Sequence, residues 1–358
     1  GKAYQAALLK ALRSAEKYIF MEYFIIGSGV MLDQILDILK EKVKHGVVVR
    51  IIYDDFGSIN AIPPHFIKEM ESIGIQTRRF NPYKPMLSVI MNDRDHRKIL
   101  VIDGRVAHTG GYNIADEYIN KKIRFGYWKD AGIRVEGECV NSFTTMFLEM
   151  WNYINKDNAV HDEFLNPHNT FSQSEKSGFV QPFCDSPLEH DDVGENLYVS
   201  IISRAKKYVY IFTPYLILGT ELSHAMISAA RSGVDVRIVV PKIPDKKLIY
   251  LQTKANFRPL IEAGVRIYLY TPGFIHSKCI VADDDTAIVG TCNLDFRSMY
   301  WNFEDFVYMY RTQCIGKIKE DAIETFAVSE EVYEESTNDI SFAGRLLQSI
   351  LQLFAPLL

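Results

Sequence analysis

Two kinds of hydrophobic pattern alternate along the first part of the chain. Apolar residues that recur at helical spacing indicate amphipathic helices, and short continuous apolar runs such as VVVRIIY indicate strands buried on both faces. Strands that are separated by helices and short turns are typical of an α/β lobe with a largely parallel sheet covered on both faces. The expected helices lie at about 3–14, 30–44 and 64–72, and the expected strands at about 17–25, 47–53, 75–80, 97–102 and 105–109.

The second half of the chain repeats this order of segments. AEKYIFMEYFI at 15–25 returns as AKKYVYIFTPYLI at 205–217. The longest echo pairs HRKILVIDGRVAHTGGYN at 96–113 with HSKCIVADDDTAIVGTCN at 276–293. An internal duplication of this length predicts two similar α/β lobes with mainly β-sheet cores flanked by helices, related by an approximate twofold axis.

A polar stretch separates the two copies. Residues 155–178 are rich in Asn, Asp, His and Ser, which is typical of a connecting segment. The last segment carries apolar residues at helical spacing and predicts an amphipathic helix, which can either pack on the second lobe or lie in lipid. We therefore expect lobe one at 1–157, a linker at 158–178, lobe two at 179–335 and a C-terminal helix at 336–358.

Composition and charge narrow the function classes. The 358 residues are 47% hydrophobic and carry a net charge of -5, which disfavours a protein that clamps nucleic acid and confines any anion site to a local patch. Five cysteines without a CxxC pair or a cluster at metal-ligand spacing indicate reduced thiols in a cytosolic compartment, and we expect no metal and no cofactor.

No apolar run reaches the roughly 18 to 20 residues that cross a bilayer. The chain begins at Gly1 rather than Met, so we expect a soluble, truncated chain that leaves room for membrane segments upstream.

Each copy contains one occurrence of the same chemically active motif. A histidine is followed by a lysine, an aspartate, a glycine and an asparagine at identical spacing in both halves. Side chains alternate along a strand, so the histidine and the lysine are expected to point to one face. Two copies that face each other would form a symmetric pocket with two imidazoles, two ammonium groups and two amides. The candidates are His96, Lys98, Asp103, Gly110 and Asn113 in the first copy and His276, Lys278, Asp283, Gly290 and Asn293 in the second.

The aspartates of the motif have two interpretations. Their constant spacing places Asp103 and Asp283 among the catalytic candidates. With Gly104 and Asp284 next to them, they can instead cap a β-turn, and the residue types favour this structural role.

Two histidines and two lysines without metal ligands suit phosphodiester exchange. The lysines and the asparagine amides would neutralise the phosphate oxygens in the transition state. One neutral imidazole would attack phosphorus while the other, protonated, donates to the departing alkoxide, which predicts a bell-shaped pH profile.

The doubled HxK(x)4D(x)6G(x)2N pattern resembles the signature of the phospholipase D superfamily. The resemblance implies that the motifs meet between the two lobes, that the reaction passes through a phosphohistidine, and that His96 is the nucleophile and His276 the acid and then the base. It also implies a carboxylate hydrogen-bonded to a catalytic imidazole, and Asp130 and Glu304 stand at matching positions. The copies are too alike for the residues themselves to assign the two histidine roles.

Further stretches, including YDDFGS, GGYNIADEY, TPGFIHSK and NLDFRSMYWNFE, resemble bacterial cardiolipin synthases, with Thr291 where Ser is usual. This resemblance implies transfer of a phosphatidyl group between two phosphatidylglycerol molecules, with phosphatidylglycerol and other anionic phospholipids as partners. It further implies work at the cytoplasmic side of a bacterial cell membrane. Aromatic candidates for a second glycerol pocket are Tyr23, Tyr215, Phe274 and Tyr300.

Alternatives within the superfamily remain open. A hydrolytic phospholipase D or another phosphatidyltransferase would use the same residues with a different acceptor. A nuclease would be expected to have a basic, aromatic-lined groove, which an acidic chain disfavours. A scaffold without activity is disfavoured by the intact pair of motifs.

Overall fold

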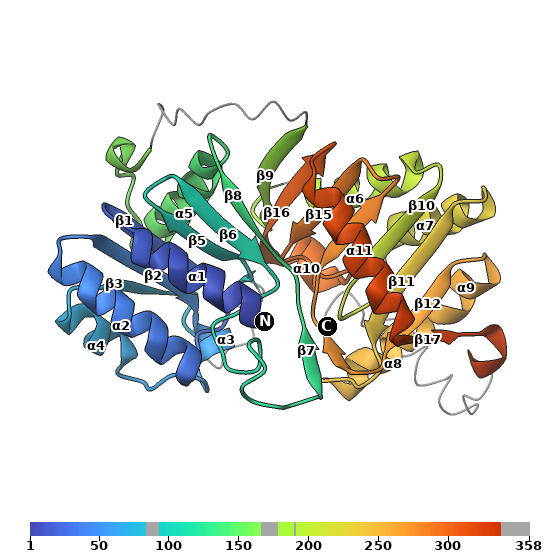
Figure 1. Ribbon diagram of the computed structural model, residues 1–358, viewed down its shortest axis with the longest axis horizontal. Coiled ribbons are helices and arrows are strands. Elements are labelled where there is room, and N and C mark those ends of the chain that lie inside the picture. The colour runs from blue at the N-terminus through green and yellow to red at the C-terminus, as the bar shows by residue number, and fades with distance from the viewer. Residues whose placement is uncertain (84–92, 166–177, 190, 338–358) are drawn as a thin grey trace.

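The computed structural model describes residues 1–83, 93–165, 178–189 and 191–337. These residues form two α/β lobes side by side (Figure 1), which confirms the predicted fold class. The predicted C-terminal helix lies outside the described residues, apart from its first two positions. Among the residues that are described, no helix is long and apolar enough to cross a membrane.

Lobe one is built on a six-stranded mixed sheet. Its strands are β1 (Tyr18–Tyr23), β2 (Val48–Asp54), β3 (Gln76–Phe80), β5 (Lys98–Ile102), β6 (Val106–Gly110) and β8 (Gly132–Glu136). They follow the order β3-β2-β1-β5-β6-β8, in which the first three are parallel and the remaining pairs antiparallel. The expectation of a largely parallel sheet was therefore wrong, because a tight turn joins β5 to β6 and such a hairpin pairs antiparallel.

Helices cover both faces of this sheet, as the buried strand patterns predicted. On one face α1 and α2 pack against Ile19 and Met21 of β1, and on the other face α5 packs against Phe20. Because neighbouring side chains of a strand point to opposite faces, β1 is buried along its whole length. The helices of lobe one are α1 (Lys2–Ser14), α2 (Val30–Lys44), α3 (Asp55–Ser58), α4 (Phe66–Ser72) and α5 (Val140–Asn155), with a 3-10 turn, η2, at Asp162–Phe164.

Lobe two is also built on a mixed sheet with helices around it. Its strands are β9 (Phe179–Asp185), β10 (Tyr208–Phe212), β11 (Asp235–Pro241), β12 (Arg266–Tyr270), β14 (Cys279–Ala282), β15 (Thr286–Gly290), β16 (Asn302–Tyr310) and β17 (Ser329–Val332). Strands β10, β11 and β12 are parallel, and β14, β15 and β16 continue the sheet antiparallel, as in lobe one. Its helices are α6 (Val193–Arg204), α7 (Thr220–Arg231), α8 (Lys247–Ala255), α9 (Phe257–Glu262), α10 (Phe296–Tyr300) and α11 (Cys314–Ala327), with η3 at Glu334–Thr337.

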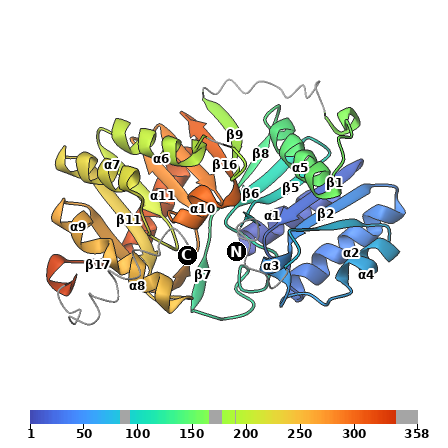
Figure 2. The same cartoon turned by 180° about the vertical axis from the view of Figure 1, so that it is seen from behind.

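The lobes are related by an approximate half-turn. Helices α1 and α2 cover the face of lobe one that is turned to the viewer in Figure 1, and α6 and α7 cover the face of lobe two that is turned to the viewer in Figure 2. Two short parallel strand pairs also join the lobes: β4 (Arg94–Asp95) pairs with β16, and β13 (Gly273–Ile275) pairs with β7 (Tyr127–Lys129). Each pair brings a motif histidine next to a strand of the other lobe.

Candidate active site

The motif histidines follow the cross-lobe strand pairs directly. His96 comes after β4, and its backbone N–H donates to the carbonyl of Phe303 in lobe two at 3.0 Å; His276 comes after β13 and donates to the carbonyl of Lys129 in lobe one at 2.7 Å. Both histidines lie in the extended links that precede β5 and β14, not on those strands as expected. Both line one cavity between the lobes and are 8% exposed.

Each imidazole is held by a carboxylate from the opposite lobe. Nδ1 of His276 lies 2.8 Å from Oδ2 of Asp130, and Nδ1 of His96 lies 2.9 Å from both carboxylate oxygens of Glu304. Thr291, the departure noted in the sequence, donates its hydroxyl to Glu304. Because Nδ1 is occupied, Nε2 of each ring is the nitrogen left for chemistry.

The motif lysines lie behind the histidines, fully buried. Nζ of Lys278 donates to the carbonyl of His276 at 2.6 Å and lies 2.9 Å from each nitrogen of that ring, and Nζ of Lys98 donates to the carbonyl of His96. Burial lowers the pKa of Lys98 to about 8 and that of Lys278 to about 7. Both lysines are behind the lining of the cavity, since the lining includes His96 and His276 but neither lysine.

The two motif asparagines line the cavity but differ in their bonds. Oδ1 of Asn113 accepts from the backbone N–H of Ile25 at 2.9 Å, and its Nδ2 donates to the hydroxyl of Tyr118 at 2.6 Å. Oδ1 of Asn293 has no hydrogen-bond partner among the described residues. Asn293 is therefore the amide with the greater remaining capacity for a ligand.

Asp103 and Asp283 are not part of the cavity, which corrects the catalytic expectation for both. The Asp103 carboxylate accepts from the backbone N–H groups of Glu16, Lys17 and Tyr18, each at 2.8 Å, and has a left-handed φ of 53°. Asp283 accepts from three consecutive backbone N–H groups, at 2.7 to 3.0 Å, just before β10. Asp103 thus fastens the β5–β6 turn to the start of β1, and Asp283 fastens the β14–β15 turn to the start of β10.

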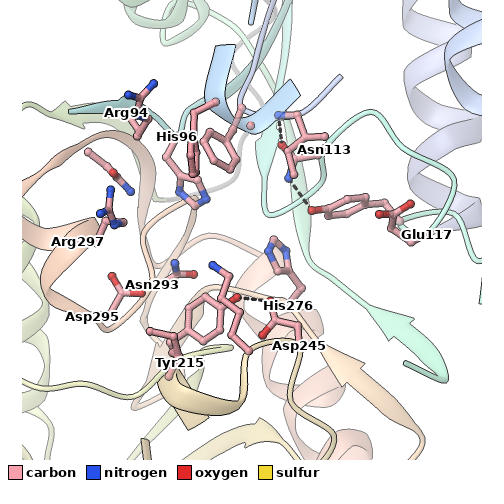
Figure 3. A pocket seen from close by; sticks show the side chains of 18 of the residues that line it. Arg94, His96, Asn113, Glu117, Tyr215, Asp245, His276, Asn293, Asp295 and Arg297 are labelled. Atoms are coloured by element: carbon pink, nitrogen blue, oxygen red, sulfur yellow. Dashed lines mark hydrogen bonds between the residues drawn. The ribbon is translucent and has the colours of Figure 1, made fainter. Parts of the chain in front are cut away.

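The cavity has a volume of about 500 Å³ and is lined by residues of both lobes (Figure 3). Of the four aromatic candidates only Tyr215 lines it, whereas Tyr23 and Phe274 are core residues. Side chains that the motif did not reveal also line it, namely Arg94, Glu117, Arg124, Trp128, Asp245, Lys246, Asp295, Arg297 and Asn302. A sequence signal for some of these residues was available, because the two copies of the chain differ at several positions close to the motif.

Burial gives the two imidazoles low proton affinity. Burial, reinforced by the neighbouring lysines, lowers the pKa of His96 well below its usual range and that of His276 to about 4. Burial also raises the pKa of Glu304 to about 7, whereas the interaction of Asp130 with His276 outweighs burial and lowers the pKa of Asp130. Of the two partner carboxylates, Asp130 beside His276 is therefore the more readily ionised one.

Within the described ranges, no three His, Cys, Asp or Glu side chains cluster so that they could hold a metal ion. The basic groups around the cavity are instead imidazoles, ammonium groups and guanidinium groups. Such groups can bind a phosphodiester and stabilise its pentacovalent transition state.

Two similar α/β lobes, with a His-x-Lys motif from each at their interface, define a protein of the phospholipase D superfamily. The profile described as "Cardiolipin synthase, PLD-like domain" matches residues 8–151 and 198–326. The chain therefore belongs to this cardiolipin synthase family, and it is a phosphatidyltransferase of the phospholipase D type.

Individual relatives agree with this assignment. An uncharacterized protein of Streptococcus mutans is 49% identical over 98% of this chain and 75% of its own length. A cardiolipin synthase of Alkalihalophilus pseudofirmus is 38% identical over 100% of this chain and 71% of its own length. The crystal structure of phosphatidylserine synthase from Haemophilus influenzae matches with a TM-score of 0.72 at 16% identity, over 99% of this chain and 91% of that one, and shows the same fold.

Proposed function

We propose that the chain transfers a phosphatidyl group from one phosphatidylglycerol to another, which gives cardiolipin and glycerol. The observation that carries this proposal is the pair of buried histidines, each oriented by a carboxylate of the other lobe. Relatives named cardiolipin synthase that align over the whole chain support the choice of substrate.

In the first step, Nε2 of His96 attacks phosphorus and the bond to the glycerol oxygen breaks. Its low pKa keeps His96 neutral, with a lone pair on Nε2, at physiological pH. The charge of the bound phosphodiester and the ionised Asp130 at 2.8 Å together favour the imidazolium form of His276, which has a low pKa in the free protein. This imidazolium gives its proton to the leaving glycerol. A phosphatidyl group is then bonded to His96, and neutral glycerol leaves.

In the second step, the hydroxyl of another phosphatidylglycerol enters the space that glycerol left. Neutral His276 removes its proton, the new phosphorus–oxygen bond forms, and the bond to His96 breaks. Rings of Phe24 near His96, and of Tyr118 and Trp128 near His276, lie 5.0 to 5.4 Å from the imidazoles. These aromatic groups limit water around the intermediate and favour transfer over hydrolysis.

The test is a product assay with purified protein and phosphatidylglycerol vesicles. Cardiolipin and glycerol in equal amounts support the proposal. Phosphatidic acid as the only lipid product would identify a hydrolytic phospholipase D and contradict it. No turnover would contradict both activities.

The buried lysines make phosphate binding dependent on pH. A bound phosphodiester anion favours the protonated forms of Lys98 and Lys278, so their pKa values rise from about 8 and about 7 in the free protein. We expect the affinity for glycerophosphoglycerol, whose charge is constant in this range, to be full below pH 7 and to fall as pH rises through the raised pKa values. Calorimetry at pH 7.5 in buffers of different ionisation enthalpy should show net proton uptake, and Lys278→Met should reduce it. Net proton release would contradict this assignment.

We also propose that the face around the cavity mouth contacts the bilayer. Phe56, Arg124 and Lys246 line the cavity. Ile123, next to Arg124, is 82% exposed, and Leu248, in the first turn of α8 after Lys246, is 56% exposed. Figures 1 and 2 both place the loop before β7 and helix α8 at the lower edge of the molecule. Exposed apolar side chains next to lysines and arginines suit an anionic lipid surface.

Replacing Ile123 with aspartate is expected to weaken cosedimentation with phosphatidylglycerol vesicles at least about threefold, since an apolar anchor becomes an anion. Val160, which is 77% exposed and lies near η2, provides the matched control, and Val160→Asp should bind like the parent protein. Turnover of a short-chain phosphatidylglycerol below its micellar concentration should be unchanged in Ile123→Asp. Equal loss of vesicle binding in both variants would contradict the proposed surface.

A further inference from the structure

The two motifs are copies of each other, yet three pairs of equivalent positions close to them carry residues of different chemistry. These positions lie two residues before each histidine, four after each motif asparagine and two before each partner carboxylate. The pairs are Arg94 and Phe274, Arg297 and Glu117, and Asn302 and Trp128. The symmetric steps at phosphorus do not require this difference.

The difference is built into the cross-lobe strand pairs. In the β4–β16 pair Arg94 is opposite Asn302, and in the equivalent β13–β7 pair Phe274 is opposite Trp128, with ring centroids 4.8 Å apart. One strand pair therefore carries a cation and an amide where the other carries two aromatic rings in tilted contact. Arg297, from α10, lies on the same side of the cavity as Arg94 (Figure 3). We name Arg94, Arg297 and Asn302 the cationic wall.

The two arginines of the cationic wall are close enough to affect each other. Burial and the charge of Arg94 lower the pKa of Arg297, although Asp295 opposes the shift. Arg94 is 4% exposed, and its ion pair with Asp54 is long, at 3.6 Å. Arg94 also donates to the carbonyl of Asn81 at 3.1 Å, and burial raises the pKa of its ion-pair partner Asp54 to about 7. Two partly desolvated guanidinium groups on one wall suit an additional anion.

Asn302, the amide of the cationic wall, suits a ligand that also donates a hydrogen bond. Nδ2 of Asn302 donates to Glu304 at 3.1 Å, whereas Oδ1 of Asn302 is buried and has no partner among the described residues. A buried acceptor without a partner is costly unless a ligand supplies a donor. Two cations for an anion and one acceptor for a hydroxyl fit a phosphoglycerol group.

We propose that the cationic wall binds the phosphoglycerol group of the acceptor lipid. This proposal rests on the proposed function. The acceptor carries its own phosphodiester, which the three carbons of glycerol separate from the attacking hydroxyl. The phosphate of the acceptor therefore needs a site beside the reacting phosphorus. Arg94 and Arg297 hold the phosphate, and Oδ1 of Asn302 accepts from the free hydroxyl of the glycerol. Water and simple alcohols have no phosphate to place there, so the wall selects a phospholipid acceptor.

The test compares two water-soluble acceptors with phosphatidylglycerol as donor in mixed micelles. Glycerophosphoglycerol carries the phosphate, and isotope-labelled glycerol lacks it. Arg297→Gln and Arg94→Gln are expected to lower the ratio of kcat/KM for glycerophosphoglycerol to that for glycerol by about tenfold or more, the loss of a charge-assisted hydrogen bond. Both values come from one preparation, so the folded fraction cancels. Arg105→Gln, at the exposed β5–β6 turn, serves as the control and should keep the ratio.

An unchanged ratio in both variants, or an equal fall for both acceptors, would overturn the assignment. A parent enzyme that only hydrolyses phosphatidylglycerol would contradict the proposed function instead. In that case calorimetric binding of glycerophosphoglycerol to His96→Asn, with and without Arg297→Gln, still decides the question. Weaker binding in the double variant supports a phosphoglycerol site, and equal binding overturns it.

Discussion

Replacing His96 with asparagine should abolish the phosphoenzyme and lower lipid transfer by at least about 10⁴-fold, because no other group can supply the nucleophile. His276→Asn should lower transfer from phosphatidylglycerol by about 10²- to 10⁴-fold, the usual contribution of a general acid. A phosphatidyl ester of p-nitrophenol distinguishes the two variants, because its leaving group departs without a proton. With this donor, His276→Asn should still release nitrophenol in a burst and form the phosphoenzyme, whereas His96→Asn should not.

The measurement is rapid-quench trapping of labelled protein under alkaline conditions, which preserve phosphohistidine, together with the nitrophenol burst. A burst in His96→Asn with none in His276→Asn would reverse the two roles. Full activity in both single variants would remove the paired-histidine mechanism entirely. Circular dichroism of both variants checks that loss of activity is not loss of fold.

The second large effect is expected at Arg97, which lies between the motif residues His96 and Lys98 but is itself buried. Its guanidinium is 2.6 Å from Glu22 and 3.4 Å from Asp95, and it is 3% exposed. Arg97→Met removes the positive charge from this buried group of three and leaves the carboxylates of Glu22 and Asp95 without it. We expect the free energy of unfolding to fall by about 3 to 5 kcal/mol.

The defect of Arg97→Met should depend on pH in a defined direction. Burial already raises the pKa of Glu22 and of Asp95, and Arg97 opposes that rise. Without Arg97 these pKa values rise further above their unfolded values, so the folded variant loses stability as pH increases through the raised values. Urea unfolding at pH 7 and pH 5 should show a smaller difference from the parent protein at pH 5. Arg105→Met, at an exposed turn, should differ little at either pH.

The site exists only where the lobes meet. Each histidine takes its backbone anchor and its carboxylate from the other half of the chain, so neither lobe contains a complete set. Separation of the lobes would leave Asp130 and Glu304 without their imidazoles. The histidine–carboxylate pairs therefore form only when the two lobes are docked.

The sequence by itself determined the duplication and most elements of the first copy, although it did not predict β7, β8 and α5. Helices and strands such as α2 and β2 were predicted within about two residues, because periodic burial is a local property of consecutive side chains. The motif residues were also identifiable, since identical spacing in both copies is visible without a fold. Even the structural alternative for Asp103 was open to reasoning from its turn neighbours.

The tertiary structure alone decided which groups meet. Glu304 binds His96 across 208 residues of chain and Asp130 binds His276 across 146, and spacing from the nearest motif assigns neither partner. The antiparallel half of each sheet and the cationic wall of Arg94 and Arg297 likewise depend on strand pairing and lobe docking. Such contacts arise from segments far apart in the chain, whereas hydrophobic periodicity records only the neighbours of each residue along it.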